Sequence, residues 1–148
     1  MNNLILRILE LAKNGEEGHV PSSLSILDIL EVLYDRFITK NKQNKFILSK
    51  GHASLALYVV LEKFKITKNL DNFCKFESNF GGHPDENKIK GVESSTGSLG
   101  HGFPFACGVA LAKKIKKEKG KVFVLIGDGE CNEGTVWETL LLASHHKL

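Results

Sequence analysis

Residues 121–143, KVFVLIGDGECNEGTVWETLLLA, decide the fold of this chain. They open with a continuous apolar run, Val122–Ile126, which is too short for a helix and sufficiently β-branched for a buried parallel strand. Gly127-Asp128-Gly129 ends that strand, and apolar residues then recur at helical spacing, at Val136, Leu140 and Ala143. The stretch therefore predicts a strand, a glycine turn and a helix from about Glu133 to His145.

A strand, a glycine turn and a helix N-terminus together predict an anion site, because the first helical N–H groups lack intrahelical partners. The turn also carries Asp128, and a bare carboxylate would repel a phosphate. Mg²⁺ would relieve this repulsion, since it binds one or two carboxylates together with phosphate oxygens. The alternative is a hairpin turn at Asp128-Gly129, which the helical pattern that follows disfavours.

Composition limits the possible partners of the protein. Its 148 residues suit one domain, and a hydrophobic content of 42% suffices for a core. With 20 basic and 17 acidic residues, no charge of one sign dominates. The basic run at 113–119 ends a helical pattern, where solvated lysines complement the helix dipole. A nucleic-acid patch is the alternative, but no aromatic residue or arginine interrupts the run.

Cysteine usage and hydropathy predict the compartment. The three cysteines, Cys74, Cys107 and Cys131, are odd in number and lack paired metal spacing, which suggests a reducing environment. No apolar run approaches the length of a membrane span. Residues 1–10 carry charge within an apolar stretch and lack a small-residue cleavage site, unlike a signal peptide. We expect a soluble cytoplasmic protein that binds neither nucleic acid nor membranes.

Helices dominate the pattern of the N-terminal half. Residues 2–13 predict an amphipathic helix with Leu4, Ile8 and Leu11 on one face. A loop is expected at 18–23, followed by a capping box formed by Ser25 and Asp28. The helix that it starts is expected to run to about Tyr34 and to bury four residues, Ile26, Ile29, Leu30 and Leu33.

The rest of the chain predicts one short strand at 46–48 and helices at 54–63, 71–76 and 103–117. Residues 79–102, which are rich in glycine and serine, predict a long irregular segment of the kind that is usually functional. Two strands are too few for a doubly wound domain, and the last βαβ unit lacks its return strand. We therefore expect the sequence to be part of a domain.

Four histidines directly follow a glycine: His19, His52, His83 and His101. Glycine lets the backbone turn sharply or approach a ligand closely, so these loop histidines could converge on one polar pocket and donate to phosphates or hydroxyls. Each could instead be a satisfied structural residue. Zinc binding is a further alternative, but the spacings fit none of the usual ligand patterns.

GDG followed by EG and WE, at residues 127–138, resembles the thiamine-diphosphate fingerprint of transketolases. Further motifs follow the same order from Gly18 to Leu148, and the closest likeness is to split transketolases, in which a separate N-terminal subunit binds the diphosphate half of the cofactor. Val20-Pro21-Ser22 replaces the Pro-Gly-x-Pro pattern of the undivided enzymes. That departure favours the split form and leaves the donor sugar open.

The resemblance implies a role for each histidine. Gly18-His19 resembles the segment whose histidine contacts the substrate near the reacting carbon. Gly82-His83-Pro84, with Gly91-Val92-Glu93 after it, resembles the segment whose histidine binds a hydroxyl of the donor. Ser49-Lys50-Gly51-His52 resembles the motif whose histidine meets the cofactor diphosphate.

Residues 96–102, TGSLGHG, resemble the loop that wraps the cofactor, with Gly97 and Leu99 at contact positions. His101 is a further catalytic candidate at a position where many relatives have glutamine. The resemblance also implies that the turn at 127–129 holds the diphosphate through Gly127, Asp128 and Gly129, with Asp128 as the Mg²⁺ ligand. Glu133 resembles a glutamate that helps couple active sites across a dimer.

Two parts of the family's machinery fall outside this sequence. The asparagine that completes the Mg²⁺ shell would lie beyond Leu148. The glutamate that activates the cofactor's aminopyrimidine belongs to another domain, expected on a C-terminal partner subunit that carries the pyrimidine-binding domain. We therefore expect residues 1–148 alone to bind the cofactor weakly or not at all, and to be inactive.

Together these observations predict an α/β fold of the thiamine-diphosphate-binding type, a doubly wound parallel sheet with helices on both faces, incomplete in this chain. Residues 1–148 would be the N-terminal part of a single diphosphate-binding domain. The implied reaction moves a two-carbon ketol unit from a ketose to an aldose, on sugars or sugar phosphates, in an oligomer. The alternatives are a 1-deoxyxylulose-5-phosphate synthase, a 2-oxoacid dehydrogenase component, which the block at 91–100 disfavours, or a non-catalytic interaction module.

Overall fold

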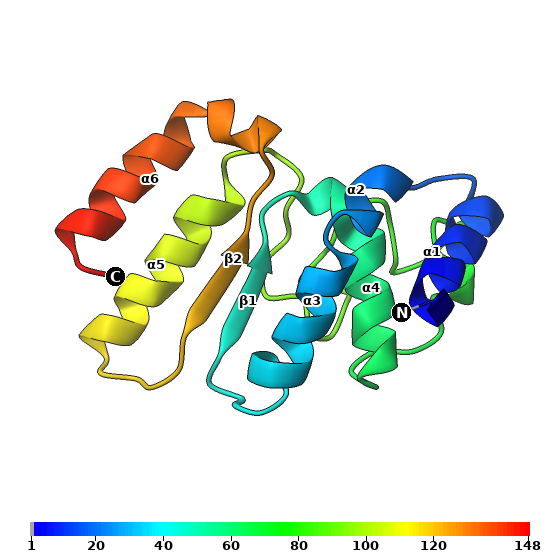
Figure 1. Ribbon diagram of the computed structural model, residues 1–148, viewed down its shortest axis with the longest axis horizontal. Helices are drawn as coiled ribbons and strands as arrows, with labels where there is room; N and C mark the ends of the chain where they lie inside the picture. The colour runs from blue at the N-terminus through cyan, green and yellow to red at the C-terminus, as the bar shows by residue number, and fades with distance from the viewer. Residues whose placement is uncertain (1) are drawn as a thin grey trace.

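Two parallel strands form the centre of the structure, a computed structural model that describes residues 2–148 (Figure 1). β1 (Lys45–Leu48) pairs with β2 (Val122–Leu125), so that Phe46 lies beside Phe123 and Leu48 beside Leu125. Helices α3 and α4 lie on one side of this pair, and α5 and α6 lie on the other. The predicted architecture, an α/β fold with parallel strands and helices on both faces, is confirmed.

Helix α4 (Ser54–Lys63) is the centre of the core. Its first eight residues, Ser54–Leu61, have no polar face, and all of them are buried. Such a helix is stable only when other elements surround it. α1 (Asn2–Gly15) packs against it through Ile8 and Leu11, as predicted, and α3 (Leu27–Leu33) contributes Leu30.

Helices α5 (Gly102–Ile115) and α6 (Gly134–His145) form the opposite layer and confirm the predictions for these stretches, with small shifts at their ends. α5 contacts β2 and buries Ala106 and Cys107. α6 contacts α5, and only Val136 and Thr139 are buried in it. Leu140 has the helical spacing predicted for the apolar face, yet it is 44% exposed.

The two strands differ in burial, against expectation. β2 was expected to be buried, yet each of its four residues is only half-buried. β1, the weaker of the two predictions, buries Phe46, Ile47 and Leu48. The free edge of β1 is covered by the irregular segment, where Lys45 pairs with Glu93 (2.9 Å) and Thr96 Oγ1 donates to the Leu48 carbonyl (2.6 Å).

The loop expected at 18–23 is largely helical, because α2 occupies Val20–Leu24 with Pro21 in its first turn, where proline is tolerated. The predicted capping box is absent. The Ser25 hydroxyl donates to the Ser22 carbonyl (2.8 Å), and Ile26 occupies the N-cap of α3. Ser25 has αR backbone angles at the end of α2, whereas a capping side chain needs an extended backbone.

Two further expectations in the first half are wrong. Ile29 is 56% exposed, because the buried face of α3 passes through Leu27 and Leu30, and a π-helix at Tyr34–Ile38 extends it beyond the predicted end. The helix predicted at 71–76 is a single 3₁₀ turn, Leu70–Asn72, since Cys74 and Glu77 adopt positive φ angles that no helix allows. Residues 79–101 contain neither helix nor strand, as predicted.

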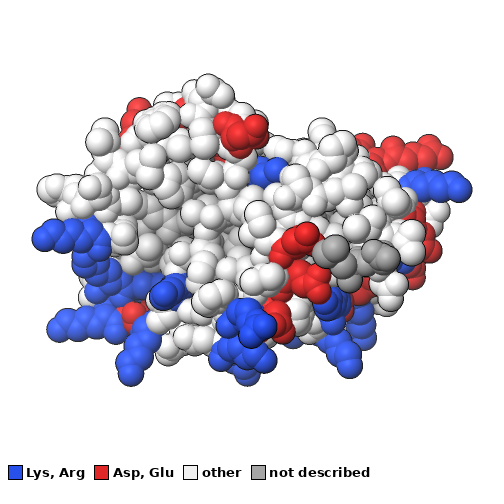
Figure 2. All heavy atoms as spheres, viewed as in Figure 1, with Lys and Arg blue, Asp and Glu red and all other residues white. Residues whose placement is uncertain are grey.

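Lysine and arginine side chains gather along the lower edge of the face seen in Figure 2, away from the carboxyl ends of the strands. Two lysines of the basic run are not simply solvated. Lys113 Nζ donates to the Gln43 carbonyl (3.1 Å), and Lys114 Nζ donates to the carbonyls of His146 and Lys147. No helix in the described part of the chain has the length and apolar character needed to cross a membrane.

A 3₁₀ turn follows each strand: Gly51–Ala53 comes after β1, and Gly129–Asn132 comes after β2. They lie at the upper edge of the sheet in Figure 1, where the residues of interest gather.

Candidate functional site

β1 and β2 end side by side, and their pairing continues one residue further, because the Ser49 amide donates to the Leu125 carbonyl (2.9 Å). The segments Ser49–His52 and Gly127–Gly129 therefore leave the sheet as neighbours. The carboxyl ends of parallel strands are where open α/β sheets bind ligands. The two strongest sequence motifs thus meet at one edge of the sheet.

The glycine-rich loop forms a third wall. A Cβ at Gly51 would lie 2.6 Å from the Thr96 carbonyl, so this loop touches the backbone that follows β1. Gly97 has φ +151°, and a Cβ there would lie 2.6 Å from the ring of His83. Only glycine permits both approaches.

Three of the four predicted histidines are brought together. The rings of His19, which precedes α2, and His52, which follows β1, lie edge to face with centroids 5.2 Å apart. His83 packs over Gly97 from the irregular segment. Burial lowers the pKa of His52 below its ordinary value, and the charges of Lys50, His19 and His83 lower it further. Both effects favour the neutral imidazole of His52.

Hydroxyl groups of α4 hold the backbone around His83. The Ser54 hydroxyl donates to the Gly82 carbonyl (2.8 Å), and the Tyr58 hydroxyl lies 3.0 Å from the carbonyls of both Gly81 and His83. A cavity of about 570 Å³ opens beside this segment, lined by residues including Glu17, Cys74 and His83. The core helix thus fixes the position of a histidine that faces open space.

His101 stands apart from the other three histidines. It is exposed at the N-cap of α5 and lines a different cavity, of about 330 Å³, with Thr96, Ser98 and Phe105. Leu99, the other loop residue singled out by sequence, is 37% exposed.

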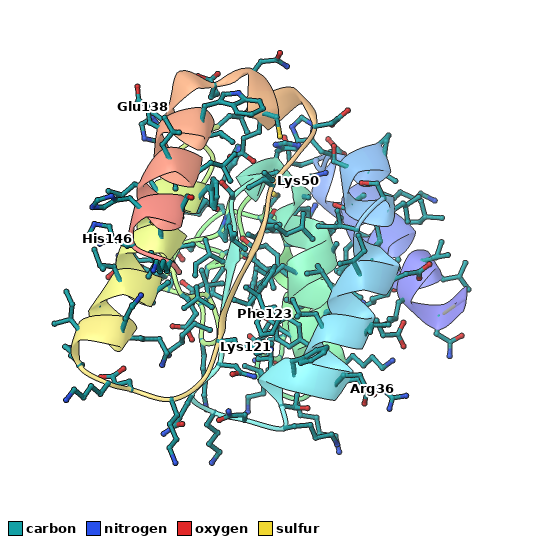
Figure 3. The ribbon with its side chains drawn as sticks, turned by 60° about the vertical axis from the view of Figure 1, so that its left-hand side comes forward. Arg36, Lys50, Lys121, Phe123, Glu138 and His146 are labelled. Atoms are coloured by element: carbon teal, nitrogen blue, oxygen red, sulfur yellow. The ribbon has the colours of Figure 1, made fainter. Side chains whose placement is uncertain are left out.

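Lys50 is the unexpected feature of this edge. Its side chain lies under the turn that follows β2 (Figure 3), and its Cδ would be 3.7 Å from a Cβ at Gly127. The residue is only 8% exposed, yet its ammonium has one long contact, 3.5 Å to the Ser25 hydroxyl, and no carboxylate partner in the part of the chain described. Lysine can bury its stem while its ammonium reaches the surface, so this ammonium is available to bind an anion.

The turn after β2 is not the hairpin considered as an alternative. Asp128 is exposed at the N-cap of a 3₁₀ turn, and α6 begins only at Gly134. The helix predicted from about Glu133 begins at Gly134, and a 3₁₀ turn occupies the residues between it and the glycine turn. No group of three or more His, Cys, Asp or Glu side chains that could hold a metal ion occurs among residues 2–148.

Glu133, the candidate interface residue, lies exposed at the N-cap of α6. Its side chain contacts the glycine loop, since a Cβ at Gly100 would lie 2.7 Å from the Glu133 Cβ. Thr135 Oγ1 also donates to the Gly100 carbonyl (2.8 Å). The start of α6 is therefore attached to the loop.

Sequence reasoning missed two residues of this edge, Lys50 and Glu130. Lys50 had a signal, because it lies between the end of a predicted strand and the singled-out His52. Glu130 had none: it is 2% exposed, and its carboxylate accepts hydrogen bonds from Ser49, Gly100 and Gly127. Nothing in the run GDGE shows that the second carboxylate turns inward while the first stays outside.

Comparison with known proteins agrees with this arrangement. Residues 3–148 match the family described as "Transketolase, thiamine diphosphate binding domain". The chain belongs to the transketolase family. The motifs that this family membership rests on include the segments that meet at the carboxyl ends of β1 and β2.

The transketolase-family chain has curated relatives of similar sequence. It is 42% identical over 144 residues to "Ferredoxin fas2" of Rhodococcoides fascians, covering 90% of this chain and 47% of that protein. It is 36% identical over 151 residues to an apulose-4-phosphate transketolase subunit of Phocaeicola vulgatus, covering 96% of this chain and 53% of that protein. The chain thus spans about half the length of these relatives.

The fold matches that of a solved transketolase. The crystal structure of transketolase from Campylobacter jejuni superposes with a TM-score of 0.78 at 30% identity, over 99% of this chain and 26% of that one. The two-stranded arrangement described above is therefore part of a larger transketolase architecture in that enzyme.

Proposed function

We propose that this chain binds thiamine diphosphate, together with Mg²⁺, at the carboxyl ends of β1 and β2. Residues 1–148 would act as the N-terminal part of one diphosphate-binding domain. The observation that carries the proposal is Lys50, whose stem is buried beside the turn at Gly127 and whose ammonium has no carboxylate partner in the described part of the chain. Family membership supplies the cofactor, and Lys50 supplies a reason for an anion at this place.

The donor set suits a diphosphate. Lys50 offers a charge, and the neutral His52 can donate one N–H to a phosphate oxygen. Asp128 is exposed and free to bind a cation, and Gly129 has no atom within 4 Å of its Cβ position, which leaves room for a ligand against the backbone. Mg²⁺ takes most of its ligands from phosphate and water, so a single protein carboxylate is a fitting contribution from this turn.

We propose ketol transfer as the reaction, from a ketose to an aldose, on sugars or sugar phosphates. When bound, the cofactor supplies the electron sink for the carbanion. His83 faces a cavity large enough for part of a sugar, and His19 lies against His52 at the cofactor end. Both imidazoles can form hydrogen bonds with hydroxyl groups of a sugar. We assign His101 to the aldose acceptor, because it lines a cavity separate from the one beside His83.

A partner chain completes the proposal. The relative from Phocaeicola vulgatus is named as one subunit of its transketolase, and this chain spans about half of it. We propose a C-terminal subunit that supplies the pyrimidine-binding domain and its glutamate, in an oligomer that Glu133 helps to couple. The three cysteines are free, which suits the reducing cytoplasm as the working compartment.

Calorimetric titration of the two-subunit protein with thiamine diphosphate, with and without Mg²⁺, tests the proposal. Asp128→Ala should weaken cofactor binding and remove its dependence on Mg²⁺. Asp35→Ala is the matched control, because Asp35 is exposed in the π-helix at the opposite end of α3. Unchanged affinity in Asp128→Ala would refute the metal assignment, and absence of cofactor binding in the wild type would refute the proposed function.

A further inference from the structure

Glu130 joins the three segments that form the candidate site. Its carboxylate accepts hydrogen bonds from the Ser49 hydroxyl at the end of β1, from the Gly100 amide of the glycine loop (2.8 Å), and from the Gly127 amide at the end of β2 (3.1 Å). The residue is 2% exposed. These segments are 81, 30 and 3 residues away from Glu130 in sequence.

The carboxylate is satisfied by neutral donors alone. Within residues 2–148 Glu130 forms no ion pair, although the stem of Lys50 passes on the other side of Gly127: a Cβ there would lie 3.7 Å from Lys50 Cδ and 3.8 Å from Glu130 Cβ. Three hydrogen bonds satisfy the Glu130 carboxylate without a cation. The Lys50 ammonium therefore remains available to a ligand.

We propose that Glu130 is a positioning residue for the cofactor. It holds the ends of both strands and the glycine loop at fixed separations, so that Lys50, His52 and the turn at Gly127 face one ligand. This inference rests on the proposed function and adds a residue to it. Glu130 touches the protein backbone, and its effect on the cofactor is exerted through Gly100, Gly127 and Ser49.

The role needs a carboxylate. One oxygen accepts from Ser49 and Gly100, and the other accepts from Gly127. Glutamine has almost the same shape but only one acceptor oxygen, so its NH₂ group would face a donor in either orientation. Glu130→Gln therefore leaves at least one buried donor unpaired, while the side-chain volume stays nearly constant.

The test measures cofactor affinity and loop protection separately in the two-subunit protein. Glu130→Gln should raise the dissociation constant for thiamine diphosphate with Mg²⁺ by about tenfold or more. It should leave the KM for the ketose donor within twofold at saturating cofactor, because the His83 segment is held by α4. Hydrogen exchange at the Gly100 and Gly127 amides should become faster. Glu118→Gln is the matched control, because Glu118 is exposed beyond the C-terminal end of α5.

The chain contains a reporter for the same turn. Its single tryptophan, Trp137, donates its indole N–H to the Cys131 carbonyl (2.8 Å), one residue beyond Glu130. Fluorescence of Trp137 on cofactor addition should change in the wild type and need about tenfold more cofactor in Glu130→Gln. Ser49→Ala, which removes one donor and keeps the carboxylate, serves if Glu130→Gln does not fold, and it should weaken affinity by a smaller factor.

Three outcomes overturn the inference. The first is a cofactor dissociation constant within twofold of wild type in Glu130→Gln or, where that variant does not fold, in Ser49→Ala. The second is a rise in the KM for the donor by the same factor as the rise in the cofactor dissociation constant, which indicates general loosening of the fold. The third is a wild type that binds no cofactor. The proposed function then fails together with this inference, and any dependence of amide exchange on Glu130 shows only a structural contact.

Discussion

Helices α4 and α6 are both rich in leucine and valine, yet they have opposite fates. α4 buries eight consecutive residues, Ser54–Leu61, whereas α6 buries only Val136 and Thr139. α4 is enclosed by α1, α2 and α3, while α6 contacts α5 and the 3₁₀ turn before it. Apolar composition therefore sets what a helix can bury, and its neighbours decide what it does bury.

The candidate site combines residues from both regions, the enclosed half around α4 and the open half around α6. Lys50, His52 and the support of His83 come from the enclosed half of the molecule, next to α4. Asp128 and Glu133 come from the open half, at the N-caps of the 3₁₀ turn and of α6. We infer that the first group is fixed by the core, and that the second depends on the contacts made through Glu130 and Gly100.

The largest expected effect compares the two helices directly. Leu61→Ala should lower the free energy of unfolding by about 2–5 kcal/mol, because Leu61 is fully buried and its loss leaves a cavity. Leu141→Ala should change it by less than about 0.5 kcal/mol, because Leu141 is 74% exposed. Urea unfolding followed by circular dichroism measures both. Equal losses would show that α6 is enclosed in solution.

The histidines test the division of the site. His83→Ala and His19→Ala should each lower kcat/KM for the ketose donor by about 10²-fold, the usual contribution of a positioned acid–base group. His52→Ala should instead act mainly on the affinity for thiamine diphosphate. Steady-state kinetics with saturating and limiting cofactor separates the two. Intact donor kinetics in both of the first two variants would show that their assigned roles are wrong.

A smaller effect concerns the exposed face of α6, where Leu140, Leu141 and Leu142 are all at least 44% exposed. Exposed apolar patches favour association, so this chain should self-associate at high concentration. Leu141→Glu should raise the dissociation constant by about tenfold, as expected when one leucine leaves an interface. Leu6→Glu on α1 is the control, since Leu6 is 63% exposed in the enclosed half. Sedimentation velocity distinguishes them, and equal effects would contradict a special role for α6.

The smallest expected effect is the uptake of a fraction of a proton when the cofactor binds. The pKa of His52 lies below its ordinary value in the free chain because of burial and the charge of Lys50. A bound diphosphate would raise that pKa, so binding should take up protons and strengthen as the pH falls from neutral toward the pKa of His52 in the free chain. Calorimetry in two buffers with different ionisation enthalpies measures the uptake. His52→Asn should abolish it, and uptake that persists there belongs to another group.

Much of this fold could be predicted from the sequence, because its decisive signals are local. The strand at Val122, the turn at Asp128 and α6 each show their own periodicity or glycine pattern. The errors concern packing. Ile29 fits a helical stripe as well as Leu30 does, and only the position of α4 shows which of them faces inward.

Only part of the candidate site could be predicted from the sequence. Residues with a sequence motif, such as His19, His52 and Gly97, do lie together. Glu130 could not be found, because its role depends on Ser49 and Gly100, which are far from it in sequence. The capping box at Ser25 failed for a related reason: the serine belongs to the end of α2, and sequence spacing does not show which helix a residue serves.

If Lys50 binds the cofactor diphosphate as proposed, the stability of this protein depends on vitamin supply. A ligand that binds only the folded state stabilises it by about 2.7 kcal/mol at a hundredfold excess over its dissociation constant, which lowers the unfolded fraction about a hundredfold. In a cell starved of thiamine, Lys50 would stay without its counterion, and proteases would meet the unfolded chain more often. We therefore expect the abundance of the protein to follow thiamine availability even when its transcription is constant.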